Sequence, residues 1–236
     1  MLGFANSMNK GELRDELAVE RTRLANERTL LAYIRTALAL AAAGAILLQF
    51  FPSYPSLFSI AWVLVVAGSG TTIDVAKELG RKVIGYDISP YREDIIQNDA
   101  RKIPLDDNFA DFVFIDSPYS DNVKYSDHPD CIGKISCEKE KFFEELEKVV
   151  KEIYRILKAD KVMAWLIGDH WRKNTGYIPV GFKVYNMLSN LFNPVDVICV
   201  VRRNQTSNTG LWHKRAREFN FYLRGFKYLF IMQKPE

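Results

Sequence analysis

The sequence predicts an α/β fold in which a Rossmann-like sheet is preceded by an N-terminal α-helical, membrane-type segment. Two observations support this division. From Gly68 to the C-terminus, short apolar runs typical of strands alternate with amphipathic runs typical of helices. Before that, residues 30–51 carry one charge, at Arg35, over a run long enough to cross a hydrocarbon core of roughly 30 Å. We therefore expect a helical segment over residues 1–67 and an α/β domain over residues 68–236.

The composition is that of a globular protein with mild basic character. The 236 residues are 48% hydrophobic and 26% charged, which excludes a fully disordered chain. A net charge of +3 permits a polyanionic partner without requiring one. The three cysteines, Cys131, Cys137 and Cys199, give no disulfide framework, so we expect a cytoplasmic location for the α/β domain.

The N-terminal segment contains three helical or apolar runs. Lys10–Thr36 has the spacing of an amphipathic helix, either solvated or lying on a membrane surface. Leu30–Phe51 is predicted as a transmembrane helix, and a buried soluble helix is the alternative. Leu57–Ala67 is too short to span a bilayer alone, and its end, Val63–Val66, also has the pattern of a buried strand. We therefore expect membrane association through residues 30–67.

The α/β domain is predicted to hold a mainly parallel sheet with helices on both faces. Glu138–Leu157 is the clearest helix, because its apolar residues fall on one face. The last two strands are expected to pair as a closing hairpin. The other predicted helices are Thr71–Leu79 and Val180–Phe192, and the predicted strands are Lys82–Tyr86, Phe109–Ile115, Val162–Ile167, Val195–Val201 and Phe221–Met232.

A glycine turn and two acids suggest a site for a nucleoside-containing cofactor. Gly68-Ser69-Gly70-Thr71-Thr72 precedes a helix, where the backbone can approach a ligand and the helix N-terminus offers amide donors. Asp87, about 20 residues further on at a strand end, suits a hydrogen bond to ribose hydroxyls. Asp99, followed by Ala100, has the chemistry to accept a hydrogen bond from an adenine amino group. A plain turn and a loop cap are the alternatives.

The strongest single motif is Asp116-Ser117-Pro118-Tyr119, which follows an apolar strand. Ligands of doubly wound sheets bind at the carboxyl ends of the strands. The Asp116 carboxylate and the Ser117 carbonyl can accept hydrogen bonds from the exocyclic amino group of a base. Tyr119 can stack on that base once it has left the duplex. An ordinary strand-to-loop turn is the alternative.

Taken in order, GSGTT, GYDIS, NDAR and DSPY resemble the signatures of amino-group DNA methyltransferases, over about 170 residues from Gly68. That family carries a motif of the form Asp/Asn/Ser-Pro-Pro-Tyr/Phe/Trp, and the tail SNTGLWHKRAREFNFYLRGFKYLFIMQK is similar to the end of one of its subgroups. The resemblance implies a seven-stranded sheet and S-adenosyl-L-methionine as cofactor. It implies methyl transfer to the amino group of adenine or cytosine in DNA, with no metal and no covalent enzyme intermediate. The expected cofactor-binding residues are Gly68, Ser69, Gly70, Thr71, Thr72, Asp87, Asp99 and Ala100, and the expected catalytic residues are Asp116, Ser117, Pro118 and Tyr119.

Two departures from the family pattern are visible. Ser117 replaces the first proline of the motif, although its carbonyl can still accept a hydrogen bond. Leu64-Val65-Val66-Ala67 replaces an Asp-Pro-Phe-like sequence, so the acid and the aromatic expected beside the methionine end of the cofactor are missing.

The N-terminal half resembles a different family. Arg21–Leu47 is similar to the membrane-protein family called domain of unknown function 202. The two resemblances compete for Leu57–Ala67, and the chain has the character of two gene fragments joined near Ala67. The alternative functions are therefore a non-catalytic membrane protein carrying an incomplete methyltransferase domain, or an RNA base methyltransferase.

Tyr125 follows DSPY closely and could line the target pocket. Basic and aromatic residues are interleaved at Trp212–Arg217, with Arg202 and Arg203 nearby. This mixture suits phosphate contacts and base stacking, with an ordinary solvated loop as the alternative. Asp127, His128, Cys131 and Cys137 fit no standard zinc spacing, so no metal site is predicted. The candidate nucleic-acid-binding residues are Tyr125, Arg202, Arg203, Trp212, Lys214, Arg215 and Arg217.

Overall fold

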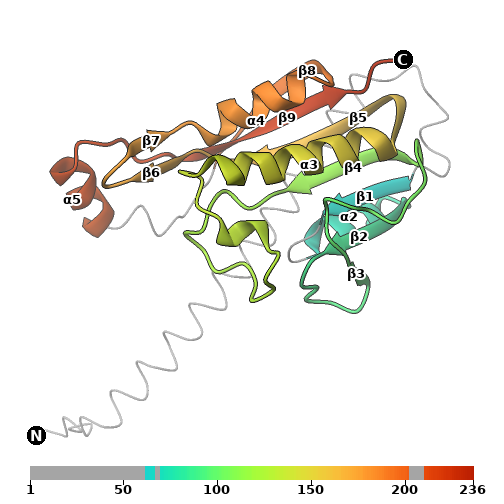
Figure 1. The fold of residues 1–236 in the computed structure, drawn as a ribbon, viewed down its shortest axis with the longest axis horizontal. Coiled ribbons are helices and arrows are strands. Elements are labelled where there is room, and N and C mark those ends of the chain that lie inside the picture. Colours follow the sequence, from blue (N-terminus) through green and yellow to red (C-terminus); the bar gives the residue numbers. More distant parts are fainter. Residues whose placement is uncertain (1–61, 67–69, 202–209) are drawn as a thin grey trace, which may run out of the picture. The chain divides into compact units, whose positions relative to one another are not determined.

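The computed structural model describes residues 62–66, 70–201 and 210–236 (Figure 1). The chain divides into two units, Met1–Phe51 and Pro52–Glu236, and every described residue belongs to the second. The predicted amphipathic and transmembrane helices and the segment Arg21–Leu47 lie outside the described residues. Within the described ranges, no helix has the length and apolar character needed to cross a membrane.

The described residues form a seven-stranded sheet in the order β3-β2-β1-β4-β5-β9-β8 (Figure 1). The first five strands run parallel, and β9 lies antiparallel between β5 and β8. The predicted sheet and its closing hairpin are confirmed. The strands are β1 Trp62–Val66, β2 Lys82–Asp87, β3 Ile95–Gln97, β4 Ala110–Asp116, β5 Leu157–Ile167, β8 Asn193–Val201 and β9 Phe226–Gln233.

The central strand β1 lies in the segment for which helix and strand competed in the sequence. Its residues Trp62–Val66 pair with β2 on one side and with β4 on the other. A β-branched, continuously apolar run is what a parallel strand inside a sheet requires. The strand interpretation therefore holds for Trp62–Val66, and the sheet begins before the boundary predicted at Gly68.

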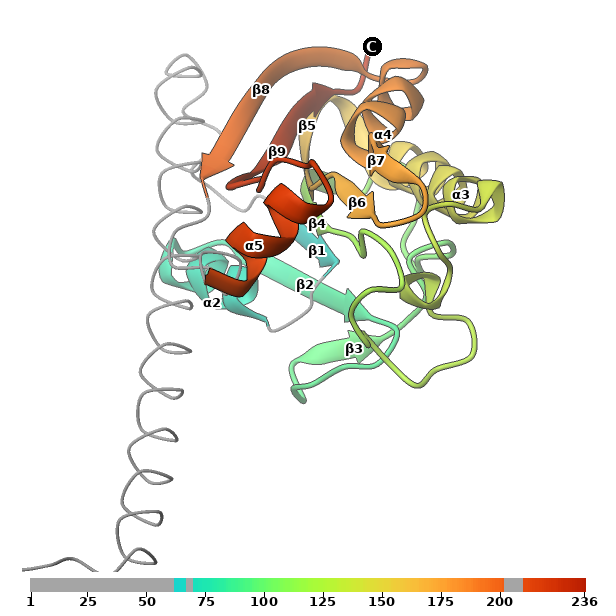
Figure 2. The same cartoon turned by 90° about the vertical axis from the view of Figure 1, so that its left-hand side faces the viewer.

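Helices lie on both faces of the sheet, as predicted. Figure 2 shows α3 (Glu140–Ile156) and α4 (Val180–Ser189) on one side and α2 (Thr71–Glu78) on the other. The predicted apolar stripe of α3 is buried against the sheet, where Trp165 and Met163 of β5 are fully enclosed. The buried residues of α3 are Phe142, Phe143, Glu145, Leu146, Val149, Val150, Ile153 and Ile156.

One prediction about the C-terminal region was wrong, the start of its last strand. The basic segment around Trp212, for which a solvated loop was the alternative, forms a helix, α5 (Gly210–Glu218). The last strand begins at Phe226 rather than Phe221, because Phe221 leaves the sheet and stacks on Trp171 with 4.0 Å between ring centroids. Further elements that the sequence did not predict are β3, the short helix Ile132–Lys134 and a hairpin of β6 (His170–Arg172) and β7 (Gly176–Ile178).

Candidate active site

The register of the parallel strands brings the predicted motifs to one edge of the sheet. Val66, the last residue of β1, pairs with Tyr86 of β2 and with Ile115 of β4. Asp87 and Asp116 each follow the paired residue by one position, so both acids stand just beyond the end of β1. The connections leave β1 and β4 in opposite directions along the sheet. This is the switch point at which doubly wound sheets bind ligands.

The turn that follows β1 reaches the helix α2 through Gly70. Gly70 is left-handed, with φ of 80°, and its carbonyl accepts hydrogen bonds from the amides of Ile73 (3.0 Å) and Asp74 (3.2 Å). A Cβ at Gly70 would lie 2.9 Å from Nη1 of Arg92, so both conformation and space favour glycine. Thr71 and Thr72 form the first turn of α2, whose amides suit an anionic or polar ligand. Gly68 and Ser69 lie outside the described residues.

Arg92 holds the β2–β3 loop against α2. Its guanidinium donates to both carboxylate oxygens of Asp74, each at 2.7 Å, and to Asp94 at 2.8 and 2.9 Å. Lys77 also donates to Asp94 at 2.7 Å. These bonds hold the pKa of Asp94 well below its usual range, at about 2, with Lys77 the larger cause and Arg92 the second. The network fixes the start of α2 relative to the loop that follows Asp87.

Asp87 is the acid best placed for a ribose hydroxyl. It is half-buried at the end of β2, and its Oδ1 accepts a hydrogen bond from the amide of Ser89 at 2.8 Å. Burial raises the pKa of the carboxyl, and the Ser89 amide opposes that rise only in part. A partly desolvated carboxylate at this position is a strong acceptor for a ligand hydroxyl.

Asp99 is bound to a neighbouring arginine. Arg101 donates from Nε to Oδ1 (2.9 Å) and from its backbone amide to the same oxygen (2.9 Å). Burial raises the pKa of Asp99, but its bonds to Arg101 outweigh burial, so the pKa lies below its ordinary value. Arg101 also pairs with the buried Glu145 of α3, which ties the loop carrying Asp99 and the half-buried Ala100 to the core. Asp99 therefore orders this loop, whatever ligand contact it adds.

The Asp116 carboxylate is exposed at the sheet edge between two partners. The hydroxyl of Tyr119 donates to Oδ1 at 2.8 Å, and Nζ of Lys227 lies 3.8 Å from the same oxygen. Lys227 also lies 4.7 Å from the centroid of the Tyr119 ring. The Asp116 side chain is 45% exposed, so it has room to accept a further hydrogen bond.

The other residues of the DSPY motif are held by contacts with β5 and with the chain that follows the motif. Ser117 is buried, and its hydroxyl accepts a 2.9 Å hydrogen bond from the indole N–H of Trp165 on β5. Tyr125 folds back on the motif, because its hydroxyl accepts a 3.5 Å bond from the amide of Tyr119. Gly133 makes this approach possible, since a Cβ there would lie 2.5 Å from the Tyr125 ring and 3.2 Å from Cβ of Pro118. Of the candidate nucleic-acid residues, Tyr125 thus lies beside the DSPY motif.

The remaining described candidates, Trp212, Lys214, Arg215 and Arg217, lie together on α5, separate from the motif. All four are exposed, and the Arg215 guanidinium lies 5.2 Å from the centroid of the Trp212 ring. Arg202 and Arg203 lie outside the described residues.

Sequence reasoning missed two residues of this region, Lys227 and Trp165. Each contacts the DSPY segment or the residues after it from another strand, and a single sequence carries no signal for such distant pairs. Among the residues that the structure describes, no three His, Cys, Asp or Glu side chains are grouped to hold a metal. Cys131 and Cys137 are buried and not disulfide-bonded.

Two family models match parts of the chain. The model described as domain of unknown function (DUF202) matches residues 14–74, and the model described as DNA methylase matches residues 65–98. The matches overlap at residues 65–74, the junction at which the two resemblances met in the sequence. No match to this chain was found among curated proteins.

Solved structures similar to this chain include several methyltransferases. A protein of Galdieria sulphuraria, provisionally assigned as a sarcosine dimethylglycine methyltransferase, is 13% identical with a TM-score of 0.55, covering 86% of this chain and 85% of that one. A protein of Pyrococcus horikoshii is 14% identical over 81% and 87% of the two chains, with a TM-score of 0.47. A provisionally assigned DNA modification methylase of Thermus thermophilus, complexed with S-adenosyl-L-methionine, is 18% identical over 59% and 54%, with a TM-score of 0.42. The first of these likenesses establishes an α/β methyltransferase-like fold for the sheet and its helices.

Proposed function

We propose that this protein is an S-adenosyl-L-methionine-dependent methyltransferase that acts on the exocyclic amino group of adenine or cytosine in DNA. One observation carries the proposal. The turn at Gly70 and the motif at Asp116 follow adjacent parallel strands that end in register, Val66 opposite Ile115. A cofactor above the turn and a base above the motif would therefore meet at the switch point.

The residues present fit the nucleoside half of the cofactor. Asp87 supplies a half-buried acceptor for the ribose, and the left-handed Gly70 leaves the backbone accessible at the start of α2. The proposed cofactor-binding set also includes Asp99, Ala100, Thr71 and Thr72, together with Gly68 and Ser69, which precede Gly70 in the sequence. At the end of β1 the chain has Leu64-Val65-Val66-Ala67, which supplies no acid for the methionine half. When bound, S-adenosyl-L-methionine supplies an electrophilic methyl group.

The DSPY motif binds and orients the target base. The Asp116 carboxylate and the Ser117 carbonyl accept hydrogen bonds from the two N–H groups of the target amine, which directs the nitrogen lone pair toward the donor. The Tyr119 ring stacks on the base after it leaves the duplex. The Trp165 bond to Ser117 fixes the backbone that carries the accepting carbonyl. No enzyme nucleophile is needed.

Transfer of a tritiated methyl group from labelled cofactor to DNA tests the proposal. Asp116→Ala removes an acceptor and is expected to reduce transfer at least a hundredfold, about 2.7 kcal/mol of transition-state stabilisation. Asp116→Asn keeps an acceptor oxygen and should retain part of the rate, because the role is hydrogen-bond acceptance rather than proton removal. Asp106→Ala, an exposed acid in the loop before β4, is the matched control and should transfer at the wild-type rate. Equal transfer by Asp116→Ala would refute the assignment, and transfer to RNA but not DNA would move the substrate to RNA.

Calorimetry with S-adenosyl-L-methionine separates an enzyme from the non-catalytic alternative. The full chain is expected to bind the cofactor, and Asp87→Ala is expected to weaken that binding. A folded chain that binds no cofactor would favour a membrane protein with an incomplete methyltransferase domain.

We also propose that the methyltransferase domain is cytoplasmic and associates with a membrane through the apolar run at residues 30–51. The bound at residue 67 expected from the sequence was wrong, because Trp62–Val66 forms β1 of the sheet. The apolar run at residues 30–51 and the match to domain of unknown function 202 at residues 14–74 motivate this proposal. Cell fractionation without detergent checks it: recovery of the full chain in the soluble fraction would contradict membrane association.

A further inference from the structure

A groove lined by aromatic rings lies between the β6–β7 hairpin and the segment that follows α5. Its volume is about 650 Å³. Trp171 of β6 and Phe221 line it, with their rings stacked at 4.0 Å and 23°. Tyr177 of β7 and Tyr222 also line it, and they are 46% and 91% exposed. We call this feature, defined by Trp171, Tyr177, Phe221 and Tyr222, the aromatic groove.

The exposed tyrosines distinguish the aromatic groove from a small hydrophobic core. The stacked pair Trp171 and Phe221 has an evident structural role, because it holds the tail of α5 on the hairpin. Tyr222 has no such role, since nine-tenths of it faces solvent. Exposed rings beside an existing stack offer planar faces on which further planar groups can stack.

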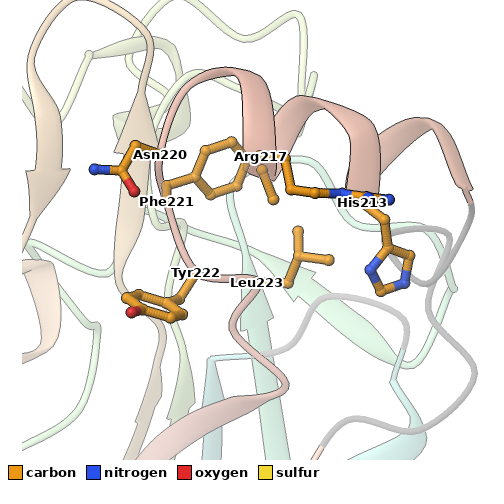
Figure 3. Close-up of a pocket in the computed structure, with 7 residues that line it drawn as sticks. His213, Arg217, Asn220, Phe221, Tyr222 and Leu223 are labelled. Atoms are coloured by element: carbon orange, nitrogen blue, oxygen red, sulfur yellow. The ribbon is translucent and has the colours of Figure 1, made fainter.

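Cations accompany the rings. The Arg224 guanidinium lies 4.3 Å from the centroid of the Tyr177 ring, and Nζ of Lys173 lies 4.6 Å from that of Phe219. A second hollow of about 490 Å³ continues the groove under α5. Figure 3 shows His213 and Arg217 directed from α5 into this hollow, above Leu223. Two acids are nearby. Glu218 is the last residue of α5, and Asp169 accepts a 2.7 Å hydrogen bond from the hydroxyl of Tyr177.

Arg172 ties the aromatic groove to the catalytic motif. Arg172 is the neighbour of Trp171 on β6, and its Nη2 donates to Oγ of Ser120 at 3.0 Å and to the carboxylate of Asp121. Ser120 is fully buried and immediately follows Tyr119. The hairpin that forms one wall of the groove is therefore fixed to the chain that leaves the DSPY motif.

We propose that the aromatic groove binds unpaired nucleotides that flank the target base, so that the protein acts on single-stranded or locally melted DNA. The inference rests on the function proposed above and specifies the form of its substrate. Bases stack on exposed aromatic faces without regard to sequence, and basic side chains neutralise the phosphates between them. Duplex bases are already stacked on one another and cannot enter such a groove. A strand held there would lead to the DSPY motif through the contact made by Arg172.

The test is fluorescence anisotropy of the full chain with a labelled DNA of about 16 nucleotides, at the upper end of the site sizes of single-strand-binding domains, presented as a single strand and as a duplex. Single-stranded DNA should bind at least tenfold more tightly. Tyr222→Ala removes a solvent-exposed ring that the fold does not need, and it should weaken single-strand binding roughly tenfold, the loss expected for one stacked base. Tyr91→Ala, an 86% exposed tyrosine of the β2–β3 loop, is the matched control and should bind like wild type. Arg224→Ala should lower the slope of log affinity against log salt by about 0.7.

Equal affinity for the two DNA forms, with no effect of Tyr222→Ala, would overturn the inference. Tighter binding of the same sequence as RNA would overturn DNA as the occupant. The outcome is independent of methyl transfer. If single-strand binding depends on Tyr222 while Asp116→Ala leaves transfer unchanged, the groove stands and the proposed chemistry falls. If transfer depends on Asp116 but the groove variants bind single-stranded DNA like wild type, the proposed chemistry stands and the groove proposal falls.

Discussion

At the residue scale, the chemistry of Asp116 depends on a side chain from the far end of the chain. Lys227 of β9 brings its ammonium to 3.8 Å from the Asp116 carboxylate and 4.7 Å from the centre of the Tyr119 ring. The ammonium attracts both the carboxylate and the face of the Tyr119 ring, so it restrains the positions of these two side chains. Lys227 is thus a positioning residue for the two side chains expected to hold the base.

Replacement of Lys227 by Gln removes the charge and keeps a flexible polar side chain. We expect kcat for methyl transfer to fall about tenfold, the equivalent of about 1.4 kcal/mol, because Asp116 and Tyr119 lose a shared partner. The dissociation constant for the cofactor should not change, since Lys227 is not part of the proposed cofactor set. Lys151→Gln, an exposed lysine of α3, controls for loss of charge. A weakened cofactor affinity with an intact kcat would contradict the positioning role.

Asp87 gives a pH dependence with a definite sign. Burial holds its pKa above the ordinary value of 3.8, so it becomes protonated at a higher pH than a free aspartate would. A protonated carboxyl loses acceptor capacity, and cofactor affinity should therefore fall as pH decreases, by about tenfold per unit below that pKa. Calorimetry from neutral pH into the acidic range checks this, since a carboxyl with a raised pKa begins to lose its charge at a higher pH than a free aspartate does. In Asp87→Asn the decline should be absent, and an unchanged decline would assign the titration to another group.

Individual contacts of this kind could not be predicted from the sequence. DSPY was recognisable because the strand and the four residues are contiguous. The Trp165 bond to Ser117 joins residues 48 positions apart, and nothing in either local pattern specifies the partner. The same is true of Arg172 and Ser120, which are 52 positions apart.

At the scale of elements, the junction between α3 and β5 depends on a buried lysine near the C-terminus. Nζ of Lys234 donates to the carbonyls of Tyr154 and Leu157, each at 2.7 Å, and to Oδ1 of Asn108 at 2.8 Å. These bonds satisfy carbonyls that the end of a helix leaves without partners, and a cation is favoured there. Lys234 therefore joins the last strand to the end of α3.

Lys234→Met fills a similar volume and removes all three donors. We expect the free energy of unfolding to fall by about 2–3 kcal/mol, because hydrogen bonds from a charged donor are lost and two carbonyls stay buried. Urea denaturation followed by circular dichroism measures this. Lys141→Met, at an exposed position of α3, is the control and should change the free energy of unfolding by less than about 0.5 kcal/mol. Equal effects of the two substitutions would show that the buried ammonium contributes little.

Elements with strong periodicity were predictable, and elements set by tertiary contacts were not. The stripe of α3 identified that helix and its buried face, and apolar runs identified β2, β4, β8 and most of β5. The β6–β7 hairpin has no alternating pattern, and all three residues of β6 are half-buried. Contacts with distant residues hold Trp171 and Arg172 in place. Phe221 has the character of a strand residue, yet stacking on Trp171 takes it out of the sheet.

At the scale of the whole molecule, the sequence could predict the arrangement of the site because few parallel topologies are possible. A strand, a crossover helix and a second parallel strand place both carboxyl ends at the same edge, and the crossovers share one handedness. GSGTT, Asp87 and Asp116 each follow an apolar run, so their meeting at one edge was implied. The sequence could not decide the secondary structure of residues 57–67, because a short apolar run is compatible with both a strand and a membrane helix. Pairing with β2 and β4 decides in favour of the strand for Trp62–Val66.

That pairing leads to a prediction about the division of the chain. The sheet, its helices and the buried core all lie within Pro52–Glu236, and the sheet begins at Trp62. A fragment of residues 52–236 should therefore unfold in one cooperative transition. It should bind S-adenosyl-L-methionine with the affinity of the full chain, because the proposed cofactor residues fall between Gly68 and Ala100.

A second fragment, which begins at residue 68, follows the boundary predicted from the sequence and lacks β1. Loss of a central strand removes the ladder between β2 and β4, so this fragment should not fold. Circular dichroism melting and calorimetry compare the two, and a stable, cofactor-binding fragment 68–236 would show that Trp62–Val66 is dispensable to the sheet.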